Sequence, residues 1–394
     1  MLRQLSKRLP VLLCGTVFRV SCLHRRVWTL VTVSLSSCPN RLDMSIDIVQ
    51  ESTKRFKESN KLVIGTHDGI FHCDELLACF MLQQLPRYAN ASIVRTRDSK
   101  LLDQCDIVVD VGAVFDREKN RFDHHQKSFN ETMNSLQPEA DVKREIRLSS
   151  AGLIYTYFGE DVIREVLAQN YVAIPNADMI RGVYRKVYDN LIAEIDAIDN
   201  GVPMFDGEPV YTINTHLSAR VNHFNPAWNE QVNDADLIKR FEKAKAYVGN
   251  EFIDKVLYYA NVWWPAREIV ENAVKKRKEI HSSGAILELE HSCPWKEHLY
   301  ELEETYDIAG IPKYVIFFNK ENDWRVICVP LQPASFVCRK FLAAPWRGQR
   351  DEHLEQISGI KGITFCHQTG FIGGNQTRQG ALEMAIKSYE AVEN

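Results

Sequence analysis

The strongest constraint on the fold is a series of short apolar segments between residues 61 and 111. The first, 61–67, has the composition of a buried strand, and 74–85 has the pattern of a helix that ends before Pro86. Two further segments, 91–96 and 106–111, are predicted to be strands. The order strand, helix, strand, strand predicts a parallel α/β sheet.

The rest of the chain divides into polar, helical and strand-rich segments. Residues 120–148 are polar and are predicted to form a long loop, whereas 149–200 are predicted to be helical. The charged, periodic segment 235–280 is predicted to form one or two helices, bent near Pro265. Short apolar runs and a closing helix are predicted after Gly284, at 285–289, 313–318, 324–329, 362–366 and 377–391.

These segments predict two domains and a connector. The expected regions are a parallel-sheet domain over 61–232, a helical connector over 233–282 and a smaller α/β domain over 283–394. The net charge of −4 argues against a highly basic nucleic-acid coat protein but allows a local basic groove. None of the 10 cysteines forms a CxxC pair, which argues against a zinc knuckle and indicates a reduced, intracellular protein.

The N-terminal segment 1–43 has the composition of a mitochondrial transit peptide. It has seven basic residues before its first acidic residue, Asp43, with serine and apolar residues between them. A secretory signal with an apolar core at 11–14, or a disordered leader, is the alternative. A start at Met44 would remove the leader and allow a nuclear or nucleolar form. Membrane insertion is not expected, because no apolar stretch approaches the ~20 residues that span a bilayer.

Two imidazoles and a carboxylate lie where the first predicted strand ends and the predicted helix begins. These residues are His67, His72 and Asp74. Open parallel sheets bind ligands at the carboxyl ends of their strands, so this position favours a functional site. A lone histidine is more often structural, but three such residues within eight positions indicate a metal site.

Two further groups of polar residues lie later in the chain. Asp110 ends a buried strand, where a carboxylate needs a cation or strong hydrogen bonds; the alternative is a turn cap before Gly112. The adjacent residues Asp123, His124 and His125 could supply a ligand, a phosphate contact and an orienting carboxylate. A surface histidine pair is the alternative for this run.

A fourth group lies at the end of the helical segment. Asp196 and Asp199 share one helical face, where like charges repel each other unless a cation lies between them. A charged helix end before a cap at Gly201 is the alternative. Imidazoles and carboxylates without thiolates suit Mn²⁺, Mg²⁺ or Zn²⁺. Two such ions about 3.5–4 Å apart would activate water for attack on phosphorus, which predicts a metal-dependent hydrolase.

In this order, the motifs resemble the DHH phosphoesterase superfamily and, more closely, the melanocyte proliferating gene 1 family of exonucleases. The superfamily includes family II pyrophosphatases and RecJ-type exonucleases. The resemblance covers 61–392. Its seven separated motifs are 65–67 with 71–75, 108–112, 123–126, 148–155, 293–298, 345–348 and 370–374.

The resemblance implies a centre of two divalent ions, Mn²⁺ or Mg²⁺, with Asp110 shared between them. The implied ligands are His67, His72 and Asp110 for one ion, and Asp74, Asp110, His124 and Asp199 for the other. Asp196 is the alternative to Asp199. His125 would contact the scissile phosphate, and Asp123 would orient the neighbouring histidines.

The resemblance also implies that the C-terminal domain binds substrate. Gly373 and Gly374, before the last predicted helix, would let backbone amides approach an anion, and Arg378 would clamp a phosphate. Arg347 and Phe371 would contact nucleic acid through phosphate and base stacking; a structural role is the alternative for both.

The implied activity is 3′-5′ exonucleolytic hydrolysis of single-stranded RNA in mitochondria and nucleus. Two positions depart from the superfamily pattern. His72 stands where Asp is usual, which leaves the metal preference open, and Asn375 stands where His often follows the paired glycines. A small-molecule phosphoesterase or pyrophosphatase is the second hypothesis, and a catalytically silent RNA-binding protein is the third. The oligomeric state cannot be predicted from these motifs.

Overall fold

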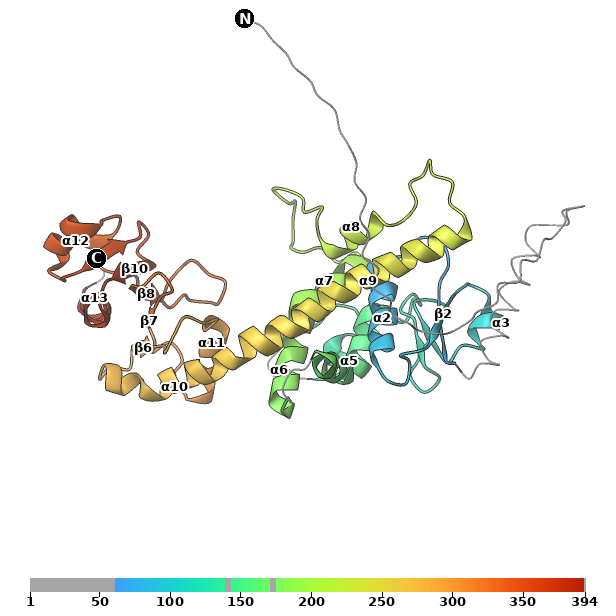
Figure 1. Cartoon of the computed structure of the whole chain (residues 1–394), viewed down its shortest axis with the longest axis horizontal. Coiled ribbons are helices and arrows are strands. Elements are labelled where there is room, and N and C mark those ends of the chain that lie inside the picture. Colours follow the sequence, from blue (N-terminus) through green and yellow to red (C-terminus); the bar gives the residue numbers. More distant parts are fainter. Residues whose placement is uncertain (1–60, 139–142, 171–174, 393–394) are drawn as a thin grey trace, which may run out of the picture. The chain divides into compact units, whose positions relative to one another are not determined.

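The computed structural model describes residues 61–138, 143–170 and 175–392, all of which belong to the compact unit Gln50–Asn394 (Figure 1). The predicted leader, 1–43, lies outside the described residues. The described chain is mixed α/β, with two five-stranded sheets and their covering helices. This arrangement confirms the predicted α/β class, whereas the DHH-type assignment of the first domain and the predicted domain boundaries stay predictions.

The first sheet is mostly parallel, with strand order β2-β1-β3-β5-β4. Its strands are β1 Val63–Thr66, β2 Ser92–Arg95, β3 Ile107–Val109, β4 Phe115–Asp116 and β5 Arg121–Phe122. β1 pairs in parallel with β2 and β3, and β3 pairs in parallel with β5. The central strands β1 and β3 are buried along their whole length, as the continuous apolar runs of a covered parallel sheet require.

Two features of this sheet differ from the prediction. β4 is antiparallel to β5, because a tight turn with Asn120 at φ 53° joins the two strands. The predicted loop 120–148 contains β5 and the short helix α4, Met133–Leu136. Neither element is long enough to show hydrophobic periodicity, so the sequence pattern could not reveal it.

Helices pack around this sheet and form one apolar core with it. The short helices α3, Ser99–Leu102, and α8, Leu217–Asn222, accompany the longer ones. The longer helices are α2 Cys73–Gln84, α5 Ser150–Gln169, α6 Ala177–Val187, α7 Ala193–Asp199 and α9 Asp234–Tyr258. Helix α2 packs against α5 and α9, and a loop of six residues, 67–72, joins it to β1. This placement brings the first turn of α2 to the carboxyl end of the sheet.

The long helical segment is interrupted next to Pro265, as predicted. A π-helical turn, Tyr259–Trp263, joins α9 to α10, Trp264–Ile280. Proline lacks a backbone N–H and crowds the preceding turn, so the regular hydrogen-bond ladder cannot continue through it. A similar π-helical turn, Tyr188–Ile192, joins α6 to α7.

The second sheet has the order β6-β7-β8-β10-β9 and is antiparallel except for the β6–β7 pair. Its strands are β6 Ile286–Glu288, β7 Tyr314–Phe318, β8 Trp324–Cys328, β9 Ile363–Cys366 and β10 Ile372–Asn375. The helical elements are α11 Lys296–Thr305, a 3₁₀ turn Ala344–Trp346, α12 Asp351–Ser358 and α13 Arg378–Glu390. Four predicted strands and the closing helix are thereby confirmed.

Strand β7 of the second sheet is covered on both faces. Along β7, Tyr314 and Ile316 contribute to one apolar cluster, with residues of α12 and α13. The intervening residues Val315 and Phe317 contribute to another cluster, with residues of α10 and α11. Because successive strand residues point to opposite faces, a strand covered on both sides is a continuous apolar run.

Candidate metal centre

The predicted site residues converge at the carboxyl edge of the first sheet. His67 directly follows β1, Asp110 follows β3, and the run that begins at Asp123 follows β5. Because these strands are parallel, their carboxyl ends lie at the same edge. Asp74 is in the first turn of α2, and Asp199 is the last residue of α7.

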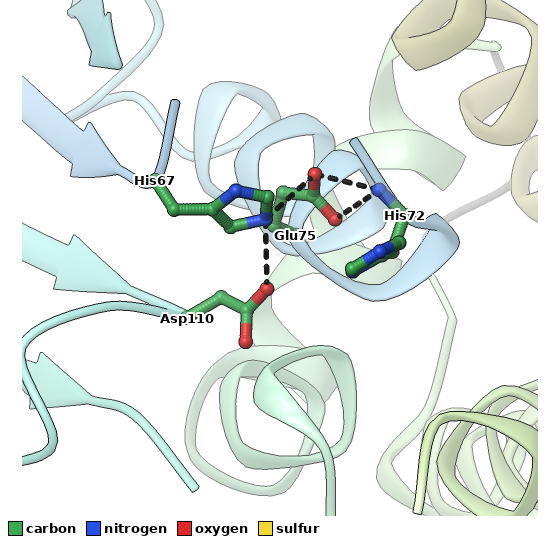
Figure 2. A group of neighbouring side chains, drawn as sticks. All are labelled: His67, His72, Glu75 and Asp110. Carbon is green, nitrogen blue, oxygen red and sulfur yellow. Dashed lines mark hydrogen bonds and ion pairs between the residues drawn. The ribbon is translucent and has the colours of Figure 1, made fainter. Parts of the chain in front are cut away.

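One group of potential ligands contains His67, His72, Glu75 and Asp110, whose ligand atoms all lie within 4.8 Å of one another (Figure 2). His67 Nε2 lies 3.1 Å from Glu75 Oε1 and 3.3 Å from Asp110 Oδ2. Figure 2 shows the His67 ring between these two carboxylates. All of these side chains except His72 are buried.

Glu75 is a site residue that the sequence analysis did not assign. Its two carboxylate oxygens accept hydrogen bonds from the His72 backbone N–H, at 2.8 and 2.9 Å, as part of a capping box for α2. A Glu at the third position of a helix is a normal cap. The sequence pattern indicates only that capping role, whereas the structure also places the carboxylate beside His67.

A second group contains Asp110, Asp123, His124 and His125, and a third contains His72, Asp74 and Asp199. His124 Nε2 lies 3.3 Å from Asp110 Oδ1 and 3.1 Å from Asp199 Oδ2. Asp110 therefore presents Oδ2 to His67 and Oδ1 to His124. This arrangement is that of a carboxylate between two potential ion positions.

The backbone at Asp110 is strained. Its φ of 58° lies in the left-handed region, which costs a residue with a side chain about 1–3 kcal/mol. Such a conformation persists only where the surroundings impose it. Here β3 ends one residue earlier, and the Asp110 N–H donates a hydrogen bond to the Phe122 carbonyl of β5. The strand ladder thus fixes the position of the carboxylate.

Asp123 and His125 form a hydrogen-bonded pair. Asp123 Oδ1 lies 2.7 Å from His125 Nδ1, and Asp123 Oδ2 accepts a hydrogen bond from the Ala113 N–H. Asp123 is buried, whereas His125 is exposed. The hydrogen bond to Asp123 raises the pKa of His125, so its imidazolium form persists to a higher pH than that of a free imidazole. The geometry is that of a buried carboxylate that orients an exposed imidazole ring.

The structure separates the two candidates at the end of α7. Asp199 contacts His124, as described above, whereas Asp196 turns to the start of α5. Asp196 Oδ1 accepts hydrogen bonds from the Ser149 N–H, at 2.9 Å, and from the Ser149 hydroxyl, at 2.7 Å. Asp196 is in none of the potential ligand groups found among the described residues. The geometry therefore favours Asp199 as the ligand.

The N-terminus of α5 contacts the carboxylates. Ser149 is its N-cap, and Ser150 is its first residue. The Ser150 N–H lies 3.3 Å from Asp74 Oδ2, and the Ser150 hydroxyl donates to the Phe122 carbonyl at 2.9 Å. The positive end of a helix dipole stabilises nearby negative charge. Helix α5 therefore offsets part of the repulsion among the buried carboxylates.

The charge distribution of the centre fits a bound cation. Burial, and next Asp110 and Asp199, raise the pKa of Asp74 well above its usual range. Burial lowers the pKa of His67 and of His124, but neighbouring carboxylates outweigh it. Asp110 and Glu75 raise the pKa of His67 to about 10, and Asp110 and Asp199 raise the pKa of His124 to about 10. Within the described residues, Asp74 Oδ1 is buried without a hydrogen-bond partner, whereas both histidine Nε2 atoms contact carboxylates at ion-pair distances. A buried carboxylate oxygen without a partner and crowded carboxylates are features that a divalent cation would satisfy.

Two residues distant in sequence hold the loop between β1 and α2. The Asn225 side chain accepts from the Phe71 N–H at 3.0 Å and donates to the Phe71 carbonyl at 2.8 Å. Arg95 donates to the carbonyls of His67 and Gly69, at 3.3 and 2.8 Å. Neither residue belongs to a local motif, so the sequence contains no signal for these roles.

Gly373 and Gly374, the predicted anion contacts, do not present free backbone amides. Gly373 and Gly374 lie in β10, paired with β8 and β9, rather than in a turn before α13. Their backbone amides therefore belong to the ladder and are not free for an anion. A Cβ at Gly373 would lie 2.7 Å from Met384 Cε, so the glycine there serves packing. The low strand propensity of glycine hid this strand from the sequence analysis.

The arginines and Phe371 have intramolecular partners. Arg378 forms two hydrogen bonds with the Glu288 carboxylate, from Nε at 2.6 Å and Nη2 at 2.5 Å. Arg347 donates to the Leu342 carbonyl at 3.0 Å, and Phe371 packs edge-on against His367. A phosphate would have to compete with Glu288 for Arg378. These contacts favour the structural alternative for Arg347 and Phe371.

The comparison with protein families decides the chain's classification. The family model MYG1_exonuc, described as "Uncharacterised protein family (UPF0160)", matches residues 63–389. The chain belongs to this family. A MYG1 exonuclease of Bos taurus is 49% identical over 324 residues, which are 82% of this chain and 83% of the relative. The MYG1 protein C27H6.8 of Caenorhabditis elegans is 48% identical, and the match covers 83% of this chain and 95% of the relative.

A human family member, named MYG1 exonuclease, is 47% identical, and the match covers 82% of this chain and 84% of the relative. Among solved structures, an exopolyphosphatase-related protein from Bacteroides fragilis is 13% identical, and the match covers 88% of this chain and 96% of that chain. Its TM-score of 0.17 is too low to establish a common fold. No helix in the described part of the chain is both long and apolar enough to cross a membrane.

Replacement of Asn225 by Ala is expected to destabilise the protein by about 2 kcal/mol, because both backbone groups of Phe71 lose their buried partner. Chemical unfolding in urea measures this change. The exposed Asn190→Ala is the matched control and should change stability by less than about 0.5 kcal/mol. Equal stability of the two variants would show that Asn225 does not hold the loop.

Proposed function

We propose that this chain is a metal-dependent exonuclease that hydrolyses phosphodiester bonds of single-stranded RNA from the 3′ end. The observation that carries the proposal is the placement of Asp110, whose two oxygens face His67 and His124 within a buried acidic centre. The exonuclease names of the bovine and human relatives support the activity. The RNA substrate and the direction rest on the resemblance of the sequence motifs.

The proposed centre holds two divalent ions, Mn²⁺ or Mg²⁺, with Asp110 shared. His67 and His72 would complete one site, with Glu75 as an additional candidate ligand. The other site would take Asp74, His124 and Asp199. When bound, the ions would supply a nucleophilic water at neutral pH and would neutralise charge on the phosphoryl oxygens.

The protein's own residues would bind and orient the phosphodiester. Asp123 holds His125 Nδ1, which leaves Nε2 as the donor of the exposed imidazolium. That N–H would donate to a non-bridging oxygen of the scissile phosphate, where negative charge increases during attack. Asp123 and His125 would therefore act as a pair, with Asp123 as the positioning residue.

Purified protein with Mn²⁺ and end-labelled single-stranded RNA should shorten the RNA stepwise from its 3′ end. Asp123→Ala and His124→Ala should each lower the rate at least about 100-fold, because charge stabilisation in such centres contributes several kcal/mol. The exposed His353→Ala, on α12, should keep the wild-type rate. Gel electrophoresis of the products measures all four proteins.

Other outcomes of this assay identify the two other hypotheses. Release of phosphate from pyrophosphate with intact RNA would indicate the small-molecule phosphoesterase. RNA binding without turnover in the wild-type protein would indicate the silent binding protein. Either result would contradict the proposed exonuclease.

Binding of Mn²⁺ to the metal-free protein at pH 8 should release protons. The pKa of His67 and of His124 is about 10, so both are protonated at this pH and must become neutral to bind a metal. The affinity for Mn²⁺ should therefore rise as the pH rises towards 10. Calorimetry in two buffers of different ionisation enthalpy measures the released protons, and a heat independent of the buffer would contradict the assignment of these ligands.

We also propose that residues 1–43 direct the protein to the mitochondrial matrix, and that a form starting near Met44 reaches the nucleus. Support comes from the composition of the segment alone. A fluorescent fusion of the full chain should co-localise with a matrix marker, and one lacking residues 1–43 should not. Equal mitochondrial signal from both fusions would refute the proposal.

A further inference from the structure

A cavity of about 370 Å³ lies beside the candidate metal centre. His72, Asp74 and Asp199 line it, and these three side chains also form one of the potential ligand groups. The remaining wall is made of residues to which the proposed chemistry gives no role. These residues include Ile195, Ile198, His216, Ser218, Ala219 and Asn222.

The wall combines an apolar surface with neutral polar groups. Ile195 and Ile198 are three positions apart on α7 and therefore share a face of that helix. Ala219, on α8, adds a small apolar side chain, whereas Ser218 and Asn222 add a hydroxyl and an amide. No arginine or lysine is among the lining residues that the structure describes. Such a wall suits the base and sugar of a nucleotide, and the phosphate would lie towards the centre.

A backbone contact of His216 assigns the tautomer of its neutral ring. Its Nδ1 accepts a hydrogen bond from the Ala219 backbone N–H at 3.2 Å. An accepting nitrogen carries no hydrogen, so the hydrogen of the neutral ring is on Nε2. His216 is half-buried, and it lines the cavity. Its Nε2–H is therefore available to an oxygen of a bound ligand.

The cavity wall is held firmly against the centre. Asn225 follows α8 by three residues and clamps both backbone groups of Phe71, which also lines the cavity. This clamp connects α8 to the loop that carries His67 and His72. The position of His216 relative to the metal ligands is thereby fixed before any ligand binds, and preorganisation of this kind lowers the cost of binding.

From these observations we infer that the cavity binds one terminal nucleotide of the substrate, with His216 Nε2–H as a donor to its phosphate or sugar. A volume of about 370 Å³ is near the lower end of the range of about 300–1,000 Å³ for ligand pockets. One nucleotide suits this space better than several do. The inference rests on the proposed function and deepens it, because a site for a single nucleotide beside the ions favours removal of nucleotides one at a time.

Equilibrium dialysis measures how tightly the full chain, with Mn²⁺ present, binds adenosine 5′-monophosphate and adenosine 3′-monophosphate. His216→Ala should raise the Kd of the better-bound isomer about tenfold, the loss of one hydrogen bond to a charged group. Ala219→Leu, which fills the cavity without removing a polar group, should also raise it at least about tenfold. His223→Ala, at the other, exposed end of α8, is the matched control and should bind like the wild type.

Binding of Mn²⁺ is the second readout, and it should stay within about twofold of the wild type in all three variants. With RNA, His216→Ala should raise KM and leave kcat nearly unchanged. Wild-type Kd values in both His216→Ala and Ala219→Leu would overturn the inference, as would a parallel loss of Mn²⁺ binding in His216→Ala. If the wild type binds the nucleotide as expected but leaves RNA intact, the proposed function fails and the nucleotide site stands.

Discussion

The contact of Asp110 with two histidines is the interaction on which the centre depends. A carboxylate at the end of a buried strand is costly unless opposite charge compensates it. Here burial would raise the pKa of Asp110, but His124 and His67 hold it well below the usual range. The strained backbone at φ 58° keeps the carboxylate in place, so its two oxygens face two different imidazoles.

The surrounding elements supply the remaining charges at fixed positions. The first turn of α2 provides Asp74 and Glu75, and the last residue of α7 provides Asp199. Helix α5 begins at the same place, with its Ser149 cap held by Asp196. A Cβ at Gly152 would lie 2.4 Å from the Asp196 carboxylate, so only glycine allows this close approach. The centre is therefore built from the ends of elements that the apolar core holds rigidly.

The sequence was informative where function and local pattern coincide. Apolar runs predicted β1, β2 and β3, and polar residues at the ends of β1 and β3 predicted that His67 and Asp110 would belong to one site. It was not informative where a contact is long-range or a residue has two roles. Glu75 is both a helix cap and a neighbour of His67, and Asn225 reaches Phe71 across 154 positions. Gly373 and Gly374 were expected to present their backbone amides to an anion, but they lie in a strand whose pairing only the fold reveals.

The most direct test of this account is the electron paramagnetic resonance spectrum of the protein after titration with Mn²⁺. If Asp110 is shared, each chain should bind two Mn²⁺ ions and give a spin-coupled spectrum. Two ions that share a carboxylate and lie about 3.5–4 Å apart are close enough to couple. Asp110→Asn, which keeps the shape of the side chain and removes its charge, should abolish the coupling. A single uncoupled Mn²⁺ per wild-type chain would contradict the central claim that Asp110 joins two metal sites.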